Sequence, residues 1–98
     1  MPEMTVTVRW PDGHQDDCYS PSLVMHDHLD EGTSYTVADF TERAVRALAE
    51  ASARVQARFG FACSSAASTT AQITDRARRY RPDDHVHVVA MHPALGES

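Results

Sequence analysis

Lysine is absent from the 98-residue sequence, and all nine of its basic residues are arginines. The missing amine excludes Schiff-base chemistry, a phosphate-binding lysine and a lysine general base. Only two cysteines are present, Cys18 and Cys63, too few for a disulfide-rich secreted scaffold, so we expect both thiols to be free. No apolar run approaches the roughly 18 residues of a membrane helix. The acidic N-terminus does not resemble a signal or transit peptide, so we expect a cytoplasmic protein without a membrane partner.

Positive charge is also scarce, with a net charge of −5 at pH 7. Nucleic-acid-binding proteins carry a basic surface, so we expect no nucleic-acid partner. Residues 1–31 carry seven acidic residues and one arginine, whereas residues 32–81 carry eight arginines and four acidic residues. Two explanations stay open: the two regions attract each other within the fold, or one of these surfaces meets a partner or a second copy of the chain.

The length suits one domain, since typical domains have roughly 100–150 residues. We expect a single domain over 1–98, with an ordered core over about 3–91 and a flexible tail over 93–98. Residues 4–10 alternate apolar and polar side chains and predict a half-buried strand. Pro11-Asp12-Gly13 predicts a tight turn, after which residues 14–19 return as a more polar edge strand.

Two helices are predicted in the middle of the chain. Thr36 to Asp39 is a variant of the capping box, and it opens a helix that Gly60 closes. The apolar residues of this helix recur every three or four positions: Val37, Phe40, Ala44, Leu48, Ala51, Val55 and Phe59. Ser64 or Ser65 caps a second helix, which Pro82 ends. Its inward-facing residues are predicted to be Ala66, Thr70, Ile73, Ala77 and Tyr80.

The remaining segments complete the fold. Residues 21–29 fit either a short helix after Ser20-Pro21 or an extended segment, and residues 30–34 predict a loop. Residues 84–91 alternate and predict a third strand. The predicted fold is α+β: a small, three-stranded, mostly antiparallel sheet, made of an N-terminal hairpin and a C-terminal strand. Two main helices cover one face, in the order β-β-(α)-α-α-β.

The histidines offer little for a metal site. His85 and His87 share one face of the predicted third strand, a spacing that zinc sites use. The solvent face of a half-buried strand also explains the pair, and it is the interpretation that we favour. The possible further ligands are dispersed along the chain: His14, His26, His28, His92, Cys18, Asp83 and Asp84. We therefore expect no metal, with His85 and His87 as the weak candidates, and no cofactor, because no nucleotide-binding or C-x-x-C motif occurs.

The cysteines are the candidates for covalent chemistry. Cys63 precedes a predicted helix N-terminus, whose partial positive charge favours the thiolate. Cys18 follows Asp16 and Asp17, which disfavour it. Three interpretations stay open: two buried small hydrophobic residues, a Cys18–Cys63 redox pair, or a reactive Cys63. Serines 64, 65 and 68 are typical of helix caps, and the arginines near the helix ends stabilise the helix dipoles.

Four segments resemble a known family: Arg9-Trp10-Pro11-Asp12-Gly13, Cys18-Tyr19-Ser20-Pro21-Ser22, Tyr35 with Asp39-Phe40, and Phe59-Gly60-Phe61-Ala62-Cys63-Ser64. Together they are similar to the small bacterial nitrogen starvation response proteins, over about residues 2–90. The genes of that family lie in nitrilase-containing clusters linked to nitrile or cyanide assimilation. The resemblance implies a setting in low-nitrogen metabolism, and no catalytic residue is carried over.

The first hypothesis for function is a non-catalytic accessory protein that binds a partner enzyme from the same pathway or carries a reactive intermediate. The alternative is a small thiol-dependent enzyme or ligand-binding protein that acts on a nitrile- or cyanide-derived compound. It would use Cys63, with Cys18, His14 or Tyr19 as further candidates. A small sheet leaves its edges and one face open, so a homodimer is a further hypothesis.

Overall fold

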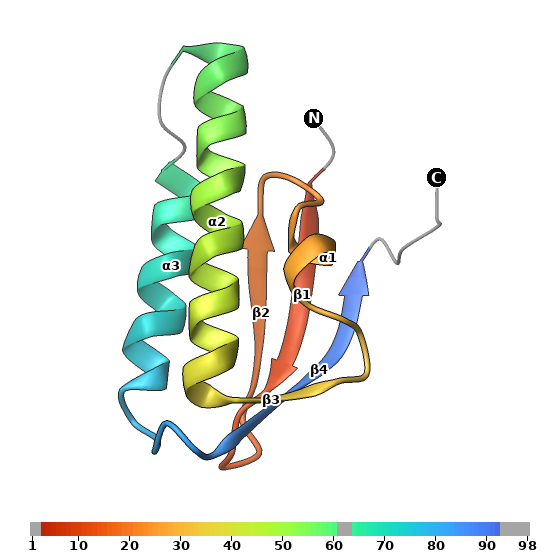
Figure 1. Ribbon diagram of the computed structural model, residues 1–98, viewed down its shortest axis with the longest axis vertical. Helices are drawn as coiled ribbons and strands as arrows, with labels where there is room; N and C mark the ends of the chain where they lie inside the picture. Colours follow the sequence, from red (N-terminus) through yellow and green to blue (C-terminus); the bar gives the residue numbers. More distant parts are fainter. Residues whose placement is uncertain (1–2, 61–63, 93–98) are drawn as a thin grey trace.

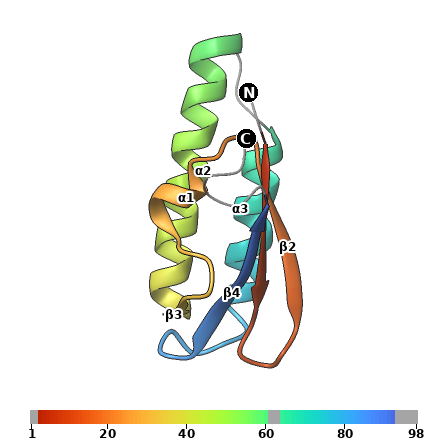
Figure 2. The ribbon, with the colours of Figure 1, turned by 90° about the vertical axis from the view of Figure 1, so that its right-hand side faces the viewer.

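The computed structural model describes residues 3–60 and 64–92. The elements are β1 (Met4–Arg9), β2 (Gln15–Ser20), α1 (Met25–His28), β3 (Ser34–Thr36), α2 (Val37–Phe59), α3 (Ser64–Ala77) and β4 (His85–His92). The strands form one antiparallel sheet in the order β2-β1-β4-β3, and the helices lie on one face of it (Figures 1 and 2). The predicted α+β class is confirmed.

The prediction of three strands was wrong, because residues assigned to a loop and a helix start form the fourth strand, β3. Ser34, Tyr35 and Thr36 pair with β4, with Tyr35 opposite Val86. Tyr35 is 9 % exposed, and its hydroxyl accepts a hydrogen bond of 2.9 Å from the Asp30 amide. A strand of three residues is too short to show an alternating pattern, so only its pairing with β4 reveals it.

The N-terminal hairpin forms as predicted. Gly13 has a φ of 90°, and its amide bonds the carbonyl of Trp10 at 2.9 Å to close the turn. β2 lies at the edge of the sheet, as its polar sequence indicated. The inward side chains of β1 and Trp10 are at most 2 % exposed: Met4, Val6, Val8 and Trp10.

The last strand, β4, carries a bulge. Thr7 of β1 pairs with Ala90 and Val8 pairs with Val88, so Val89 is the additional residue. Because a bulge exchanges the faces of the residues that follow it, Met91 joins Val88 in the core, and both are 0 % exposed. The bulge therefore lets β4 present apolar side chains to the helices on both sides of the irregularity.

The open choice for residues 21–29 resolves to a helix, the four-residue α1. Val24 and Met25 are buried at its start. His28 holds α1 against α2, since its Nε2 lies 3.0 Å from Oε2 of Glu50. Arg43 of α2 adds a hydrogen bond of 3.2 Å to the carbonyl of His28.

The long helix α2 begins and ends where the sequence predicted. The hydroxyl of Thr36 accepts a hydrogen bond of 3.1 Å from the amide of Asp39, and Gly60 follows the helix with a φ of 81°. The stripe residues Phe40 and Leu48 are at most 1 % exposed. The predicted contact of Phe61 lies outside the described residues.

The second helix, α3, ends at Ala77, before the predicted stop at Pro82. Turns continue the chain to Tyr80, whose amide bonds the carbonyl of Ala77 at 3.2 Å. The segment then crosses to the start of α2, where Ala38 N donates to Pro82 O at 3.1 Å and Val37 N to the Asp84 carbonyl at 2.7 Å. These bonds satisfy two of the amides that the first turn of a helix leaves free.

Trp10 joins the hairpin to the helices. Its ring stacks on Tyr80, with centroids 5.6 Å apart and planes 15° from parallel, and meets Phe40 edge-on, also at 5.6 Å. The indole Nε1 donates a hydrogen bond of 2.9 Å to Asp16, which also forms an ion pair of 3.4 Å with Arg76 of α3. The position of the segment after α3 is therefore fixed by aromatic packing and by charge.

Candidate functional site

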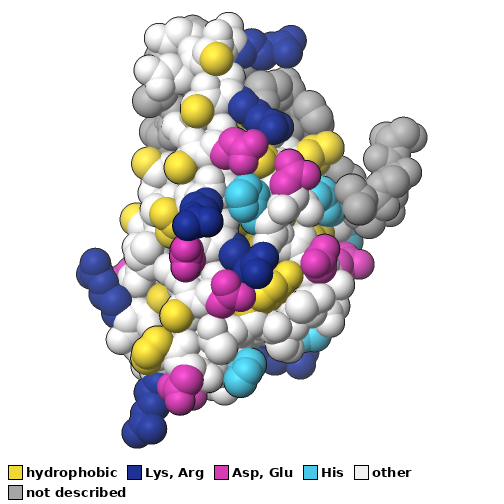
Figure 3. All heavy atoms as spheres, viewed as in Figure 1, with side chains coloured by type: hydrophobic (Ala, Val, Ile, Leu, Met, Phe, Trp, Pro, Cys, Tyr) yellow, Lys and Arg dark blue, Asp and Glu magenta, His cyan; other side chains and the backbone are white. Residues whose placement is uncertain are grey.

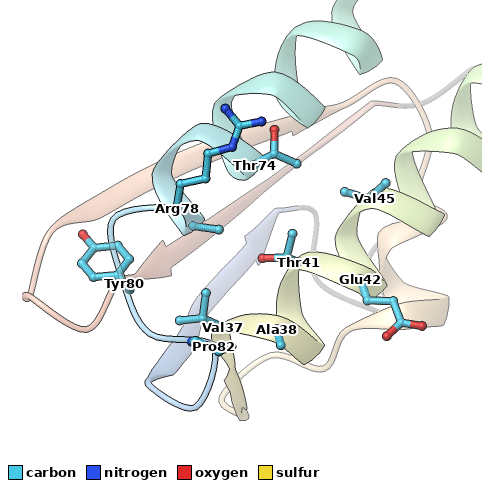
Figure 4. Close-up of a pocket in the computed structure, with 10 residues that line it drawn as sticks. Val37, Ala38, Thr41, Glu42, Val45, Thr74, Arg78, Tyr80 and Pro82 are labelled. Carbon is cyan, nitrogen blue, oxygen red and sulfur yellow. The ribbon is translucent and has the colours of Figure 1, made fainter.

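A groove opens between α2, α3 and the segment that leaves α3. Its volume is about 510 Å³, and Figure 4 shows residues of all three elements around it. We call it the α2–α3 groove. Its lining includes Val37, Thr41 and Val45 of α2, Thr74 and Ala77 of α3, and Tyr80.

The groove exists because the facing side chains are short. Thr41 and Val45 of α2 stand opposite Thr74 and Ala77 of α3, and none of them is long enough to fill the space between the two helices. Pro82 closes one end and is held there by its hydrogen bond from the Ala38 amide. This backbone hydrogen bond therefore fixes one end of the groove.

Three residues of this mostly apolar lining carry a hydroxyl group: Thr41, Thr74 and Tyr80. Thr41 Oγ1 is buried and has no hydrogen-bond partner among the described residues, whereas Thr74 Oγ1 donates to the Thr70 carbonyl at 2.9 Å. The ring of Tyr80 forms part of the wall. Burial raises the pKa of Tyr80, and the Asp12 carboxylate raises it further. The Tyr80 phenol is therefore uncharged at neutral pH.

The rim of the groove carries two charged residues, Glu42 and Arg78. Glu42 is neutralised by Arg46, one turn away, at 2.8 Å. Arg78 extends along α3 beside Thr74, while Glu42 points away from the groove (Figure 4). Among the described residues, no acidic side chain pairs with Arg78. The charge that the groove presents is therefore positive.

A smaller hollow of about 300 Å³ continues between the same helices. It shares Val45 with the α2–α3 groove and is lined on α3 by Ala66, Ala67 and Thr70. The two spaces together follow the line along which α2 and α3 meet. Hydrophobic side chains are visible along α2 in Figure 3, between charged ones.

Most of the ion-paired arginines bond an acidic residue close by in the chain. Arg43, Arg46, Arg54 and Arg79 each have an acidic partner four residues earlier, at distances of 2.8 to 3.9 Å. One ion pair within residues 3–60 and 64–92 joins an arginine-bearing helix to the acidic hairpin. It is the pair between Arg76 and Asp16. Attraction between the two regions therefore accounts for only part of the uneven charge.

The candidate thiol Cys18 is 0 % exposed and packs in the core. Burial, with smaller contributions from Asp16 and Asp17, raises its pKa to about 12. The thiol is thus protonated at neutral pH, and a protonated thiol is a poor nucleophile. This agrees with the interpretation of Cys18 as a small buried hydrophobic residue. Cys63, and with it the proposed redox pair, lies outside the described residues.

The other two candidates for thiol chemistry do not converge on Cys18. Tyr19 projects from the opposite face of the sheet, where its hydroxyl donates to Glu3 at 2.8 Å. His14 lies beside the hairpin turn, with Nε2 2.9 Å from Asp16. The structure places each of them in a separate polar contact.

The histidines of β4 lie on the face of the sheet that the helices leave open. His87 Nδ1 is 3.0 Å from the hydroxyl of Ser34, and His85 is exposed. His28 is committed to Glu50. In the part of the chain that the structure describes, no group of three or more His, Cys, Asp or Glu side chains is arranged to hold a metal ion.

The comparison with protein families matches nearly the whole range of the helices and strands, which runs from Met4 to His92. A family model described as nitrogen starvation-induced protein NitG matches residues 5–91. The chain belongs to the NitG family. This confirms the resemblance that the sequence motifs indicated. No curated protein and no solved structure matches the chain significantly. None of the NitG helices within residues 3–60 and 64–92 is both long and apolar enough to cross a bilayer.

The motif segments of this NitG protein mainly build turns and core. Trp10 fixes the hairpin to Tyr80, and Ser20 caps the end of β2 through a buried hydrogen bond of 2.8 Å to the Ser22 carbonyl. The α2–α3 groove, which sequence reasoning missed, uses other residues. The sequence held one signal for the unpaired charge of the groove. The residue four positions before Arg78 is Thr74, whereas the residue four positions before most of the paired arginines is acidic.

Proposed function

We propose that this NitG-family protein is a non-catalytic accessory protein of the nitrogen starvation response. It acts in the cytoplasm and supports nitrile or cyanide assimilation by binding an intermediate in the α2–α3 groove and presenting it to a pathway enzyme. Membership of the family supports a role in nitrogen starvation. The observation that supports binding is the preformed groove of about 510 Å³, since small-molecule sites have volumes of about 300–1,000 Å³ and are mostly apolar.

The surroundings of Cys18 favour binding over reaction. A thiol that attacks a nitrile carbon needs to ionise and to reach its substrate. Cys18 is buried with a pKa of about 12 and does not line the groove. The groove itself offers hydroxyl groups, an arginine and apolar side chains, which bind and orient a molecule without forming a covalent bond to it.

A growth experiment tests this function. A strain lacking the gene is complemented with the wild-type protein or with Thr41→Phe, and it grows on a nitrile as the nitrogen source. Thr41→Phe places a phenyl group in the groove, which obstructs part of it, and removes a hydroxyl that has no hydrogen-bond partner among the described residues. We expect the wild-type protein to restore growth and Thr41→Phe to fail.

Ala53→Phe is the matched control, because Ala53 is exposed on the same helix and lines neither hollow. It should restore growth as the wild type does. Equal cellular amounts and equal helical circular dichroism of both variants establish that folding is unaffected. Full growth with Thr41→Phe, or full growth of the strain without the gene, would overturn the proposal.

A further inference from the structure

The balance of charge around the α2–α3 groove indicates what it binds. Glu42 and Arg78 are the two charged residues of the lining. Glu42 forms an ion pair with Arg46 at 2.8 Å, which cancels its charge. Arg78 has no acidic partner among the described residues, in contrast to its neighbour Arg79, which pairs with Asp75 at 3.9 Å. A ligand at the rim therefore meets one uncompensated positive charge.

The geometry of that charge limits the kind of anion. A guanidinium offers parallel N–H donors that match the two oxygens of a carboxylate. A single arginine suits a singly charged group, and the adjoining walls, which include Val37, Val45 and Ala77, are apolar. The occupant that complements both features has an apolar body joined to one carboxylate.

The volume sets the size of the body. The groove of about 510 Å³ equals about 17 water volumes at roughly 30 Å³ each. It therefore accommodates a molecule of roughly ten to fifteen non-hydrogen atoms. The buried Thr41 hydroxyl, which has no hydrogen-bond partner among the described residues, supplies one further polar contact on the α2 wall.

We propose that the α2–α3 groove binds a small aliphatic or aromatic carboxylate, whose apolar body lies between α2 and α3 and whose carboxylate pairs with Arg78. This inference rests on the proposed function, because it assumes that the groove holds a small molecule. Beyond the proposed function, the inference specifies the charge and the size of that molecule.

Isothermal titration calorimetry with three eight-carbon probes tests the charge. Octanoate, octylammonium and 1-octanol each have eight carbon atoms and differ in the head group; the eighth carbon of octanoate is the carboxylate carbon. We expect octanoate to bind at least about tenfold more tightly than octylammonium, because charge-assisted hydrogen bonds are the stronger kind. Hexanoate should bind about 16-fold more weakly than octanoate, since each methylene contributes about fourfold. Amide shifts of Val45 and Thr74 in NMR spectra locate the bound probe.

Two variants identify the arginine. Arg78→Gln should weaken octanoate about tenfold and leave 1-octanol unchanged, whereas the matched Arg79→Gln should leave both unchanged. Equal binding of octanoate and octylammonium, equal octanoate affinity of Arg78→Gln and the wild type, or no octanoate binding would each overturn the inference.

The results also separate the inference from the proposed function. If 1-octanol binds as tightly as octanoate and shifts the same groove amides, the groove binds small molecules and the carboxylate assignment is wrong. If no probe binds but Thr41→Phe abolishes growth, the proposed function stands with an occupant of other chemistry. If no probe binds and Thr41→Phe supports full growth, both are wrong.

Discussion

The burial of Cys18 leads to a quantitative prediction about thiol reactivity. Cys63→Ser leaves Cys18 as the one thiol of the chain. Its pKa is raised from 9.0 to about 12, so the thiolate fraction at about pH 8 falls about a thousandfold, from about one-tenth to about one ten-thousandth. The sulfur is also shielded, since Cys18 is 0 % exposed. Iodoacetamide should therefore modify it at least about a thousandfold more slowly in the native protein than in the unfolded one.

Intact-protein mass spectrometry follows the modification over time. The same variant in concentrated guanidinium chloride gives the reference rate for an accessible, ordinary thiol. A native rate within tenfold of that reference would refute the placement of Cys18 in the core. In the wild-type protein, peptide mapping should find Cys63 alkylated before Cys18. Equally slow rates at both positions would remove the hypothesis of a thiol enzyme that uses Cys63.

Four further predictions concern stability. Phe40→Ala should lower the free energy of unfolding by about 3–5 kcal/mol, measured by urea denaturation with circular dichroism. Thr36→Ala removes the cap of α2 and should cost about 1 kcal/mol in the same assay. Gly60→Ala should cost about 1–2 kcal/mol, because φ is 81° there, and no change would contradict this. Glu50 has its pKa lowered, first by the hydrogen bond from His28. The ionised Glu50 carboxylate therefore stabilises the folded protein above its ordinary pKa of 4.5, and this stabilisation is lost as the pH falls through the lower pKa of the folded state. The difference in the free energy of unfolding between the wild type and Glu50→Gln should shrink over that pH range.

The sequence predicted the elements whose signals are local. α2 repeats an apolar residue every three or four positions and has both a cap and a terminal glycine, so its bounds follow from neighbouring residues alone. The hairpin likewise follows from the alternation of residues 4–10 and from the turn residues Pro11-Asp12-Gly13. β3 could not be predicted in this way, because its three residues are strand only through pairing with β4. The bulge at Val89 depends in the same way on the register with β1.

The candidate site was harder to predict than the fold. Reactive residue types drew attention to Cys18, Tyr19 and His14, which alternation and turn geometry direct to different places. The α2–α3 groove is formed where short side chains face each other. Thr41 and Thr74 leave space between them only because their two helices pack side by side. Which helix faces meet, and at what separation, is a property of tertiary packing.

The stack of Trp10 on Tyr80 has a practical consequence. Trp10 is the one tryptophan of the chain, and the tyrosine ring beneath it is also a wall of the groove. Intrinsic fluorescence excited at the indole therefore comes from a single emitter that stacks on a residue lining the groove. A molecule that displaces the tyrosine ring should alter the intensity or wavelength of that emission, so the protein contains its own optical reporter and needs no attached dye.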